Sequence, residues 1–257
     1  MNEFLIGLQF LTRISVVRQT VWTEESFGGS VKFFPLVGAV LGICYAAATG
    51  GLIFLTNGGV PLFTGAVGFF LSVWLTGAIH CDGLMDSADG LFSGREREKM
   101  LEIMKDSRAG AFGVVALVLV AALQVTALAE LVRISAAWTI AAVFSAPVTG
   151  RLAMVLVIAL FPYARPAGIG KSFAKFTTRK TLAVAAAEAV LLLTPVIFLS
   201  AEIFLAALVA LVAAVIFALE FGKFATGKLG GVTGDIYGAA EILAETLILA
   251  VFLLAAV

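Results

Sequence analysis

The sequence predicts an all-α fold, a polytopic bundle of about seven membrane-spanning helices. Hydrophobic residues make up 61% of the 257 residues and charged residues only 13%, about half the share of a typical soluble domain. The segment from Phe33 to Ile79 contains no charged residue. This composition cannot supply the polar surface of a soluble enzyme, and it excludes a disordered chain. The 17 basic and 17 acidic residues cancel, so we expect no nucleic-acid partner.

Apolar runs of about 20 residues are long enough to cross a bilayer. The uncharged stretch is divided by a polar turn at residues 56–59. The predicted spans are residues 34–55, 60–79, 111–129, 136–161, 181–199, 203–219 and 242–257. Residues 4–17 are apolar but short, so they fit a helix that lies in the membrane interface or is half-buried in the bundle, and an eighth span is the alternative. We see neither a repeat nor a flexible linker, and we expect residues 1–257 to form one integral-membrane domain.

The predicted loops alternate in charge. Lys and Arg gather in the N-terminal segment and in three longer loops, residues 80–110, 162–180 and 222–241, whereas the opposite loops are short and carry few charges. Because positive residues favour the cytoplasmic side, the N-terminus and the three longer loops are expected in the cytoplasm. The sequence therefore predicts a multi-pass protein of the cell (inner) membrane, with its polar loops facing the cytoplasm.

The densest polar segment of this apolar chain holds Asp82, Asp86 and Asp89. On a helix continuing from the second span, the three carboxylates share an arc of about 60°. Like charges this close repel one another unless a cation lies between them. Carboxylates without thiolates favour Mg²⁺, which shares its coordination sphere with water and substrate phosphates. The segment predicts phosphate chemistry at the membrane face; the simpler alternative is a solvated acidic loop.

A second polar segment directly precedes the third span and therefore lies at the level of the lipid headgroups. Lys105 and Arg108 suit phosphate groups, and Asp106 suits a metal or a substrate hydroxyl. Anchoring of the cytoplasmic end is the alternative role for the two basic residues. The alternating charges of residues 95–99 indicate a solvated helix face.

Several ionisable residues lie inside or beside predicted spans, where a charge is costly and marks a candidate site. Glu241 and Glu245 are one turn apart on the last span, and Asp235 comes just before it. Arg151 interrupts the fourth span and either pairs with such a carboxylate or binds phosphate. For these acids, packing within the bundle is the alternative to a functional role. The candidates for substrate binding in this group are His80, Arg165, Asp235 and Glu241.

Five segments carry a resemblance to a known family. They are FFPLVG at 33–38, HCDGLMDSADGLFSG at 80–94, IMKDSRAGAFG at 103–113, PYARPAGIG at 162–170 and GGVTGDIYGAAEILAE at 230–245. In this order, and over nearly the whole chain, they resemble the cobalamin synthase family of adenosylcobinamide-GDP ribazoletransferases. Two departures are Ser15, where the family commonly has proline, and Pro166, where an acid is usual.

The resemblance implies the last assembly step of the nucleotide loop of vitamin B12. The adenosylcobinamide-phosphate moiety of adenosylcobinamide-GDP passes to a hydroxyl of α-ribazole or its 5′-phosphate, and GMP leaves. Mg²⁺ on Asp82, Asp86 and Asp89 would neutralise the departing nucleotide. Lys105, Arg108 and Arg165 would hold phosphate oxygens. Asp106 is the first candidate, and Asp82 the second, to orient or deprotonate the attacking hydroxyl.

Three other functions compete with this interpretation. A CDP-alcohol-type phosphotransferase of lipid synthesis would use the same chemistry with a cytidine donor. An ion-coupled secondary transporter should place its acids in mid-span and contain an internal repeat. A structural membrane subunit would not explain three crowded aspartates. In every case the surrounding lipid is a partner, and the sequence leaves open whether the chain forms oligomers.

Overall fold

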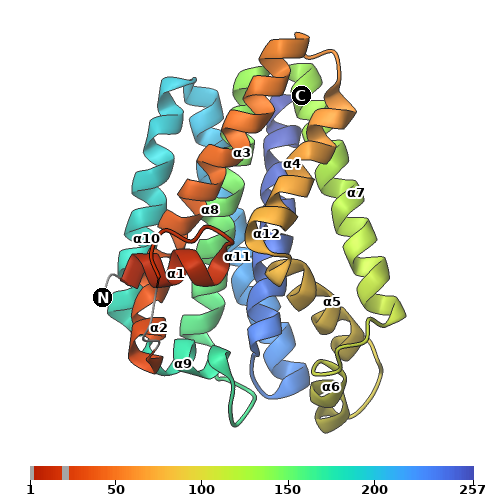
Figure 1. The fold of residues 1–257 in the computed structure, drawn as a ribbon, viewed down its shortest axis with the longest axis vertical. Helices are drawn as coiled ribbons and strands as arrows, with labels where there is room; N and C mark the ends of the chain where they lie inside the picture. Colours follow the sequence, from red (N-terminus) through yellow and green to blue (C-terminus); the bar gives the residue numbers. More distant parts are fainter. Residues whose placement is uncertain (1–2, 19–22) are drawn as a thin grey trace.

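Long helices that run along one bundle axis account for every predicted span (Figure 1). The computed structural model describes residues 3–18 and 23–257, and six of its helical segments are long and apolar enough to cross a membrane, or seven with the bent pair α4–α5. The candidate spans are built on α3 (Phe34–Thr56), α4 (Pro61–Thr76), α7 (Ala111–Ile134), α8 (Ala136–Leu160), α10 (Arg179–Leu193), which a 3-10 helix extends to Phe198, α11 (Ala201–Leu229) and α12 (Gly234–Ala256). The predicted multi-pass helical bundle is confirmed.

Local sequence signals determine where these helices begin. The hydroxyl of Ser135 accepts a hydrogen bond from the amide of Ala137 and caps α8, and Ser200 caps α11 in the same way. Thr233 caps α12 through the amide of Ile236. Side-chain oxygens at these positions satisfy amides that have no partner within the first turn. The last helix therefore begins at Gly234 rather than at residue 242 as predicted, so Asp235 lies in its first turn.

The N-terminal helix α1 (Glu3–Leu11) does not form an eighth span. Its nine residues extend about 13.5 Å, less than half the hydrocarbon thickness of a bilayer. Ile6 and Leu11 are fully buried against the bundle. The structure thus agrees with a short helix half-buried in the bundle, and not with an eighth span.

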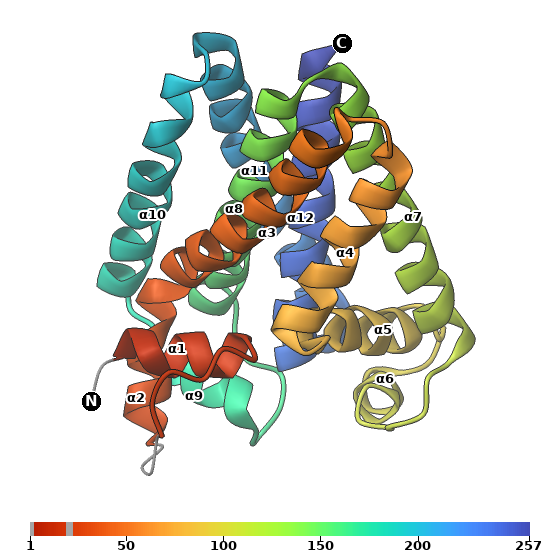
Figure 2. The same ribbon diagram turned by 45° about the horizontal axis from the view of Figure 1, so that its top comes forward.

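The chain turns sharply between α4 and α5 (Ile79–Leu91). The two helix axes differ by 91°, and Gly77 and Ala78 between them both have a φ of 63°. Gly77 adopts this left-handed conformation without steric cost, whereas Ala78 does not. The acidic segment is helical, as predicted, but it does not continue the second span. Instead, α5 turns away from the direction of α4 at one end of the bundle (Figure 2).

Helix α8 occupies the centre of the bundle. In its most apolar stretch of 18 residues, 83% of the residues are buried. The helix packs chiefly against α3 and α12. The approach to α3 is close because Gly38 lies against the backbone of Pro147 and Gly42 against that of Phe144. Small residues of this kind are typical of helix interfaces in membranes.

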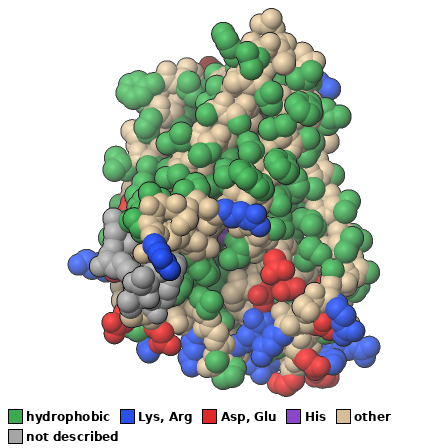
Figure 3. Space-filling model, viewed as in Figure 1, with side chains coloured by type: hydrophobic (Ala, Val, Ile, Leu, Met, Phe, Trp, Pro, Cys, Tyr) green, Lys and Arg blue, Asp and Glu red, His purple; other side chains and the backbone are tan. Residues whose placement is uncertain are grey.

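The charged residues gather at one end of the bundle. Figure 3 shows most of the visible Lys, Arg, Asp and Glu side chains at the end that carries α5 and α9, below a largely apolar surface. The short helices α2 (Glu24–Ser30), α6 (Arg97–Ile103) and α9 (Ile169–Phe176) also lie at this end, and the C-terminus lies at the other (Figure 1). The loops that were predicted to be rich in charge therefore lie at one end of the bundle, and the short loops with few charges lie at the other.

We predict that Gly38→Ala disrupts the contact between α3 and α8. An added Cβ would come within 3.0 Å of the α8 backbone, and neither helix can move without disturbing the core. Gly51→Ala on the same helix is the matched control, because its Cβ would meet nothing within 4 Å. The free energy of unfolding of Gly51→Ala should exceed that of the wild-type protein by up to about 1 kcal/mol, since alanine favours the helix. Thermal unfolding in detergent would measure both, and equal stability of the two variants would contradict the prediction.

Candidate functional site

Asp82 and Asp86 line a hollow of about 320 Å³ between α5 and the loop that precedes α7. The facing wall is formed by Lys105, Asp106 and Arg108. The structure therefore brings together the acidic segment and the basic segment that the sequence singled out. Two carboxylates opposite two cationic side chains can hold a divalent ion and phosphate oxygens in the same space.

Asp89 differs from the other two aspartates. Its carboxylate accepts hydrogen bonds from the amides of Gly110 and Gly113, at 2.7 and 2.9 Å. It therefore caps the N-terminal turn of α7, where backbone amides favour a negative group. Among the residues that the structure describes, no three His, Cys, Asp or Glu side chains are grouped to hold a metal ion. Asp89 thus joins α5 to α7 through these hydrogen bonds, and a metal site made of all three aspartates stays a prediction.

Asp106 is held by its neighbour Arg108. The guanidinium group lies 2.6 Å from one carboxylate oxygen, and the Arg108 amide also donates to the carboxylate. The side-chain hydrogen bond from Arg108, followed by that from its backbone, lowers the pKa of Asp106 to about 2. A carboxylate with such a low pKa is a weak base. The low pKa therefore counts against Asp106, the first candidate, as a base.

Arg165 and Asp235 form an ion pair of 2.7 Å, although they are 70 residues apart. Two loops bring them together: Ala164 donates its amide to Val232, and Val232 donates to Pro162, each at 2.8 Å. Gly231 permits this approach, because a Cβ at that position would collide with the Pro162 carbonyl. The pairing joins the two glycine-containing motifs and places both predicted substrate-binding residues at the charged end.

Asp82 also lines a second space, a cavity of about 170 Å³ that is enclosed by α1, α5, α8, α9 and α12. His80 and Asp235 contribute to its polar lining. Asp82 is therefore shared by the acidic hollow and the cavity, so it can contact ligands in both.

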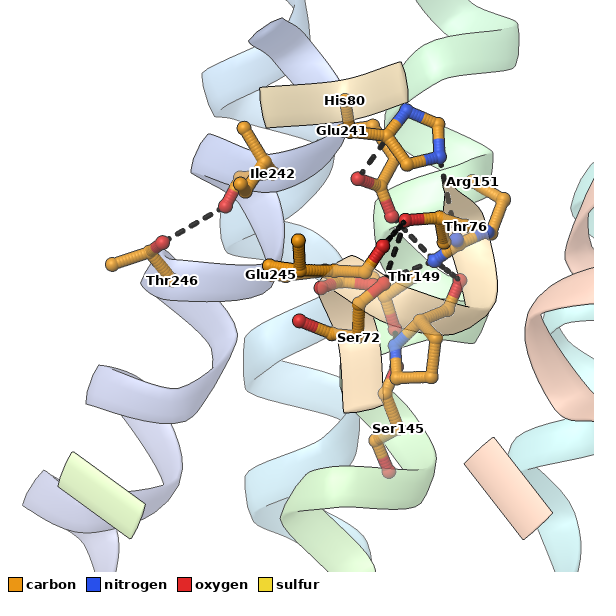
Figure 4. Close-up of polar contacts among 12 residues, drawn as sticks. Ser72, Thr76, His80, Ser145, Thr149, Arg151, Glu241, Ile242, Glu245 and Thr246 are labelled. Carbon is orange, nitrogen blue, oxygen red and sulfur yellow. Dashed lines mark hydrogen bonds and ion pairs between the residues drawn. The ribbon is translucent and has the colours of Figure 1, made fainter. Parts of the chain in front are cut away.

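A buried cluster of charges lies at the junction of α5, α8 and α12 (Figure 4). Arg151 donates to Glu245 at 2.6 Å and forms an ion pair with Glu241, and the two carboxylates belong to successive turns of α12. The Nε2 atom of His80 lies 3.4 Å from the Arg151 guanidinium. Of the two alternatives for Arg151, pairing with an intramembrane carboxylate is the one observed.

The cluster changes the interpretation of Glu241. Its side chain is 1% exposed and lines neither the acidic hollow nor the 170 Å³ cavity. We expected Glu241 to bind substrate, but its contacts are with Arg151 and, at 3.7 Å, with His80. A carboxylate at this depth requires such a partner, since an isolated buried charge is strongly unfavourable.

Arg97 also differs from expectation. The charged segment 95–99 was expected to be a solvated helix face, yet Arg97 donates to the carbonyls of Leu229 and Ala164, at 2.7 and 3.3 Å. Leu229 is the last residue of α11, where unpaired carbonyls favour a cation. Arg97 thus connects α6 to the end of α11 and to the loop that carries Arg165.

Comparison with known sequences agrees with these motifs. The cobalamin-5-phosphate synthase family matches residues 3–253. The chain belongs to this family. No solved structure matches the chain.

Several curated relatives are similar over nearly their entire lengths. A protein of Desulfitobacterium hafniense is 39% identical over 97% of this chain and 95% of its own. A protein of Syntrophobacter fumaroxidans is 40% identical, with 96% of both chains covered. One from Pseudomonas aeruginosa is 37% identical over 97% of this chain and 96% of its own. Each bears the name adenosylcobinamide-GDP ribazoletransferase.

Sequence reasoning missed one side chain at this family's candidate site. Tyr237 lines the 170 Å³ cavity and is 1% exposed. Its position inside the GDIYG segment, two residues after Asp235, was a usable signal, but an aromatic residue in an apolar helix is more commonly a packing residue. The apolar part of the cavity had no sequence signal, because it is assembled from helices far apart in the chain.

We predict that Arg151→Met is far more harmful than Glu245→Gln. Loss of the guanidinium leaves two carboxylates buried without a cation, a defect that typically costs about 3–5 kcal/mol. Glu245→Gln keeps the pair between Arg151 and Glu241 and should cost about 1 kcal/mol. Yield and thermal unfolding in detergent would show the difference. Equal losses for the two variants would mean that Arg151 is not the centre of the cluster.

Proposed function

We propose that this protein is an adenosylcobinamide-GDP ribazoletransferase, as its relatives are named. It would transfer the adenosylcobinamide-phosphate moiety to α-ribazole or its 5′-phosphate and release GMP. The observation that carries the proposal is the position of Asp82, which lines both the acidic hollow and the separate cavity. A phosphoryl transfer between two substrates needs such a group between the binding places of donor and acceptor.

The acidic hollow is suited to the diphosphate of the donor. Mg²⁺ is commonly held by one or two carboxylates together with substrate phosphates, and Asp82 and Asp86 offer such a pair. When bound, the ion would neutralise charge on the departing GMP. Asp89 is not needed in this role, because its carboxylate accepts amides of α7. Two carboxylates, rather than the three first expected, are therefore the proposed ligands.

The basic residues have separate tasks in this proposal. Lys105 is exposed on the wall of the hollow and is free to bind a phosphate oxygen. Arg108 would bind phosphate while remaining paired with Asp106. Arg165, paired with Asp235, would hold a substrate anion beside the same end of α12. Catalysis would consist mainly of positioning and charge neutralisation, as in other phosphoryl transfers.

The first test is direct. Purified protein with Mg²⁺, adenosylcobinamide-GDP and α-ribazole should release GMP, and a cytidine-activated alcohol donor should not react. Asp82→Asn should lower kcat by about 10²-fold or more, because it removes a proposed ligand and base together. Glu202→Gln, at the opposite end of the bundle, is the control and should keep the normal rate. A fully active Asp82→Asn variant would refute the assignment.

We also propose that the charged end faces the cytoplasm, as the distribution of Lys and Arg indicates. In sealed cells, a membrane-impermeant thiol reagent added outside should not label Arg97→Cys, Lys171→Cys or Lys228→Cys. It should label Asn57→Cys in the turn between α3 and α4, which is at the other end. Both native cysteines would first be replaced by serine. The reverse labelling pattern would invert the proposed orientation.

A further inference from the structure

An apolar groove of about 340 Å³ is formed by residues of α5, α7, α11 and α12. Every residue that lines it is apolar except Ser87. Leu119, Leu123 and Phe224 on its walls are exposed, so the groove is open to the surroundings of the bundle. Because α7 and α11 are both candidate membrane spans, this surface meets hydrocarbon rather than water.

The length of α11 indicates the depth at which this groove lies. Its 29 residues extend about 43 Å, the thickness of a bilayer with its headgroups. Its last residue, Leu229, is bound by Arg97 of α6 at the charged end, so the last turn lies at the level of the headgroups. The groove includes Phe224, just over one turn earlier, and continues along α7 for about 10 Å, from Ala116 to Leu123. It therefore extends from the headgroup level into the hydrocarbon.

A cation without a counter-charge lies at the charged end of the groove. The ammonium group of Lys228 is 6.0 Å from the ring centre of Phe224, which lines the groove. Lys228 is exposed, and in the described part of the chain it forms neither an ion pair nor a hydrogen bond. Lys223, one turn earlier, differs because it pairs with Glu220 at 2.6 Å. Basic groups between spanning helices at this level attract the headgroups of anionic lipids.

We propose that this groove binds one acyl chain of an anionic phospholipid, whose phosphate lies beside Lys228. A space of about 150 Å³ holds the six carbons of benzene, so 340 Å³ has room for about a dozen carbon atoms of an acyl chain. The apolar walls are suited to the chain, and the unpaired ammonium group is suited to the phosphate. A zwitterionic lipid offers the same chain but no net charge to balance Lys228. The proposal does not depend on the proposed function.

The bound chain would lie against the reverse side of the acidic helix. Leu84, Ala88 and Leu91 share one face of α5 and line the groove. Asp82 and Asp86 of the same helix line the acidic hollow instead. A lipid in the groove therefore completes the apolar packing of α5 after its sharp turn, and it should stabilise the folded protein because it binds that state alone.

Removal of the cation tests the headgroup contact. The purified protein in detergent would be titrated with phosphatidylglycerol or phosphatidylcholine of identical chains, and native mass spectrometry would count the bound lipids. The first phosphatidylglycerol should bind more tightly than the first phosphatidylcholine. Lys228→Gln should weaken the binding of phosphatidylglycerol by about fivefold and leave that of phosphatidylcholine unchanged. Lys180→Gln is the matched control, because Lys180 is an exposed lysine in the first turn of α10 and lies outside the groove.

Filling the groove tests the contact with the chain. Ala116→Phe places a ring in the groove from the α7 wall and should abolish the tight binding of the first lipid of either kind. Ala122→Phe on the same helix is the control, because Ala122 is exposed and does not line the groove. Phosphatidylglycerol should raise the Tm of the wild-type protein and of Ala122→Phe, but not that of Ala116→Phe.

Three results would overturn the proposal. An unchanged preference for phosphatidylglycerol in Lys228→Gln would show that the headgroup lies elsewhere. Normal lipid binding by Ala116→Phe would show that the chain is not in the groove. A wild-type dimer that Ala116→Phe converts to a monomer would assign the groove to a second copy of the chain. None of these measurements uses GMP release, so failure of the proposed function would leave their result unaffected.

Discussion

The ion pairs of Arg151 with Glu241 and Glu245 are the constraint on which the arrangement of the charged end depends. They join the central helix α8 to α12, and His80 brings α5 into the same cluster. Asp82 is two residues beyond His80, and Asp235 is six residues before Glu241. Both candidate substrate-contacting carboxylates are therefore positioned by a buried cluster in which Arg151, Glu241 and Glu245 line neither the acidic hollow nor the 170 Å³ cavity. A buried ion pair is weak support for stability, but it specifies register strongly, because a shifted helix would leave charges unpaired.

Much of the fold follows from the sequence because hydropathy and loop charge are local properties. The apolar runs locate the spanning helices, and the serine and threonine caps explain several of their ends. The turn at Gly77 and Ala78 was not predictable in this way, since the residues on both sides are compatible with one continuous helix. The last helix was predicted to begin too late, because Asp235 and Glu241 reduce the local hydropathy although their partners on other elements make a helical position acceptable.

The residue types that make up the candidate site were predictable from the sequence, but the roles of the individual residues were not. The residue types at 82–89 and 105–108 identified two segments that the structure brings together around one hollow, whereas the phosphate and metal chemistry expected of them stays a prediction. The role of Asp89 depends on amides 21 and 24 residues away, and that of Arg97 depends on a carbonyl 132 residues away. Spacing along one helix contains no information about such partners. The same holds for Tyr237, whose unpaired hydroxyl is visible only once the surrounding helices are packed.

The 91° turn before α5 determines how the acidic face is presented. Had α5 continued α4, its successive aspartates would lie at increasing depth along the bundle axis, and a bound substrate would have to be threaded lengthwise. After the turn, the same spacing runs across the bundle instead. On the proposed function, a bulky water-soluble donor would then meet the carboxylates side-on and keep most of its volume in solvent. The left-handed conformation of Ala78 is thus the local cost of an acidic helix that runs across the bundle rather than along it.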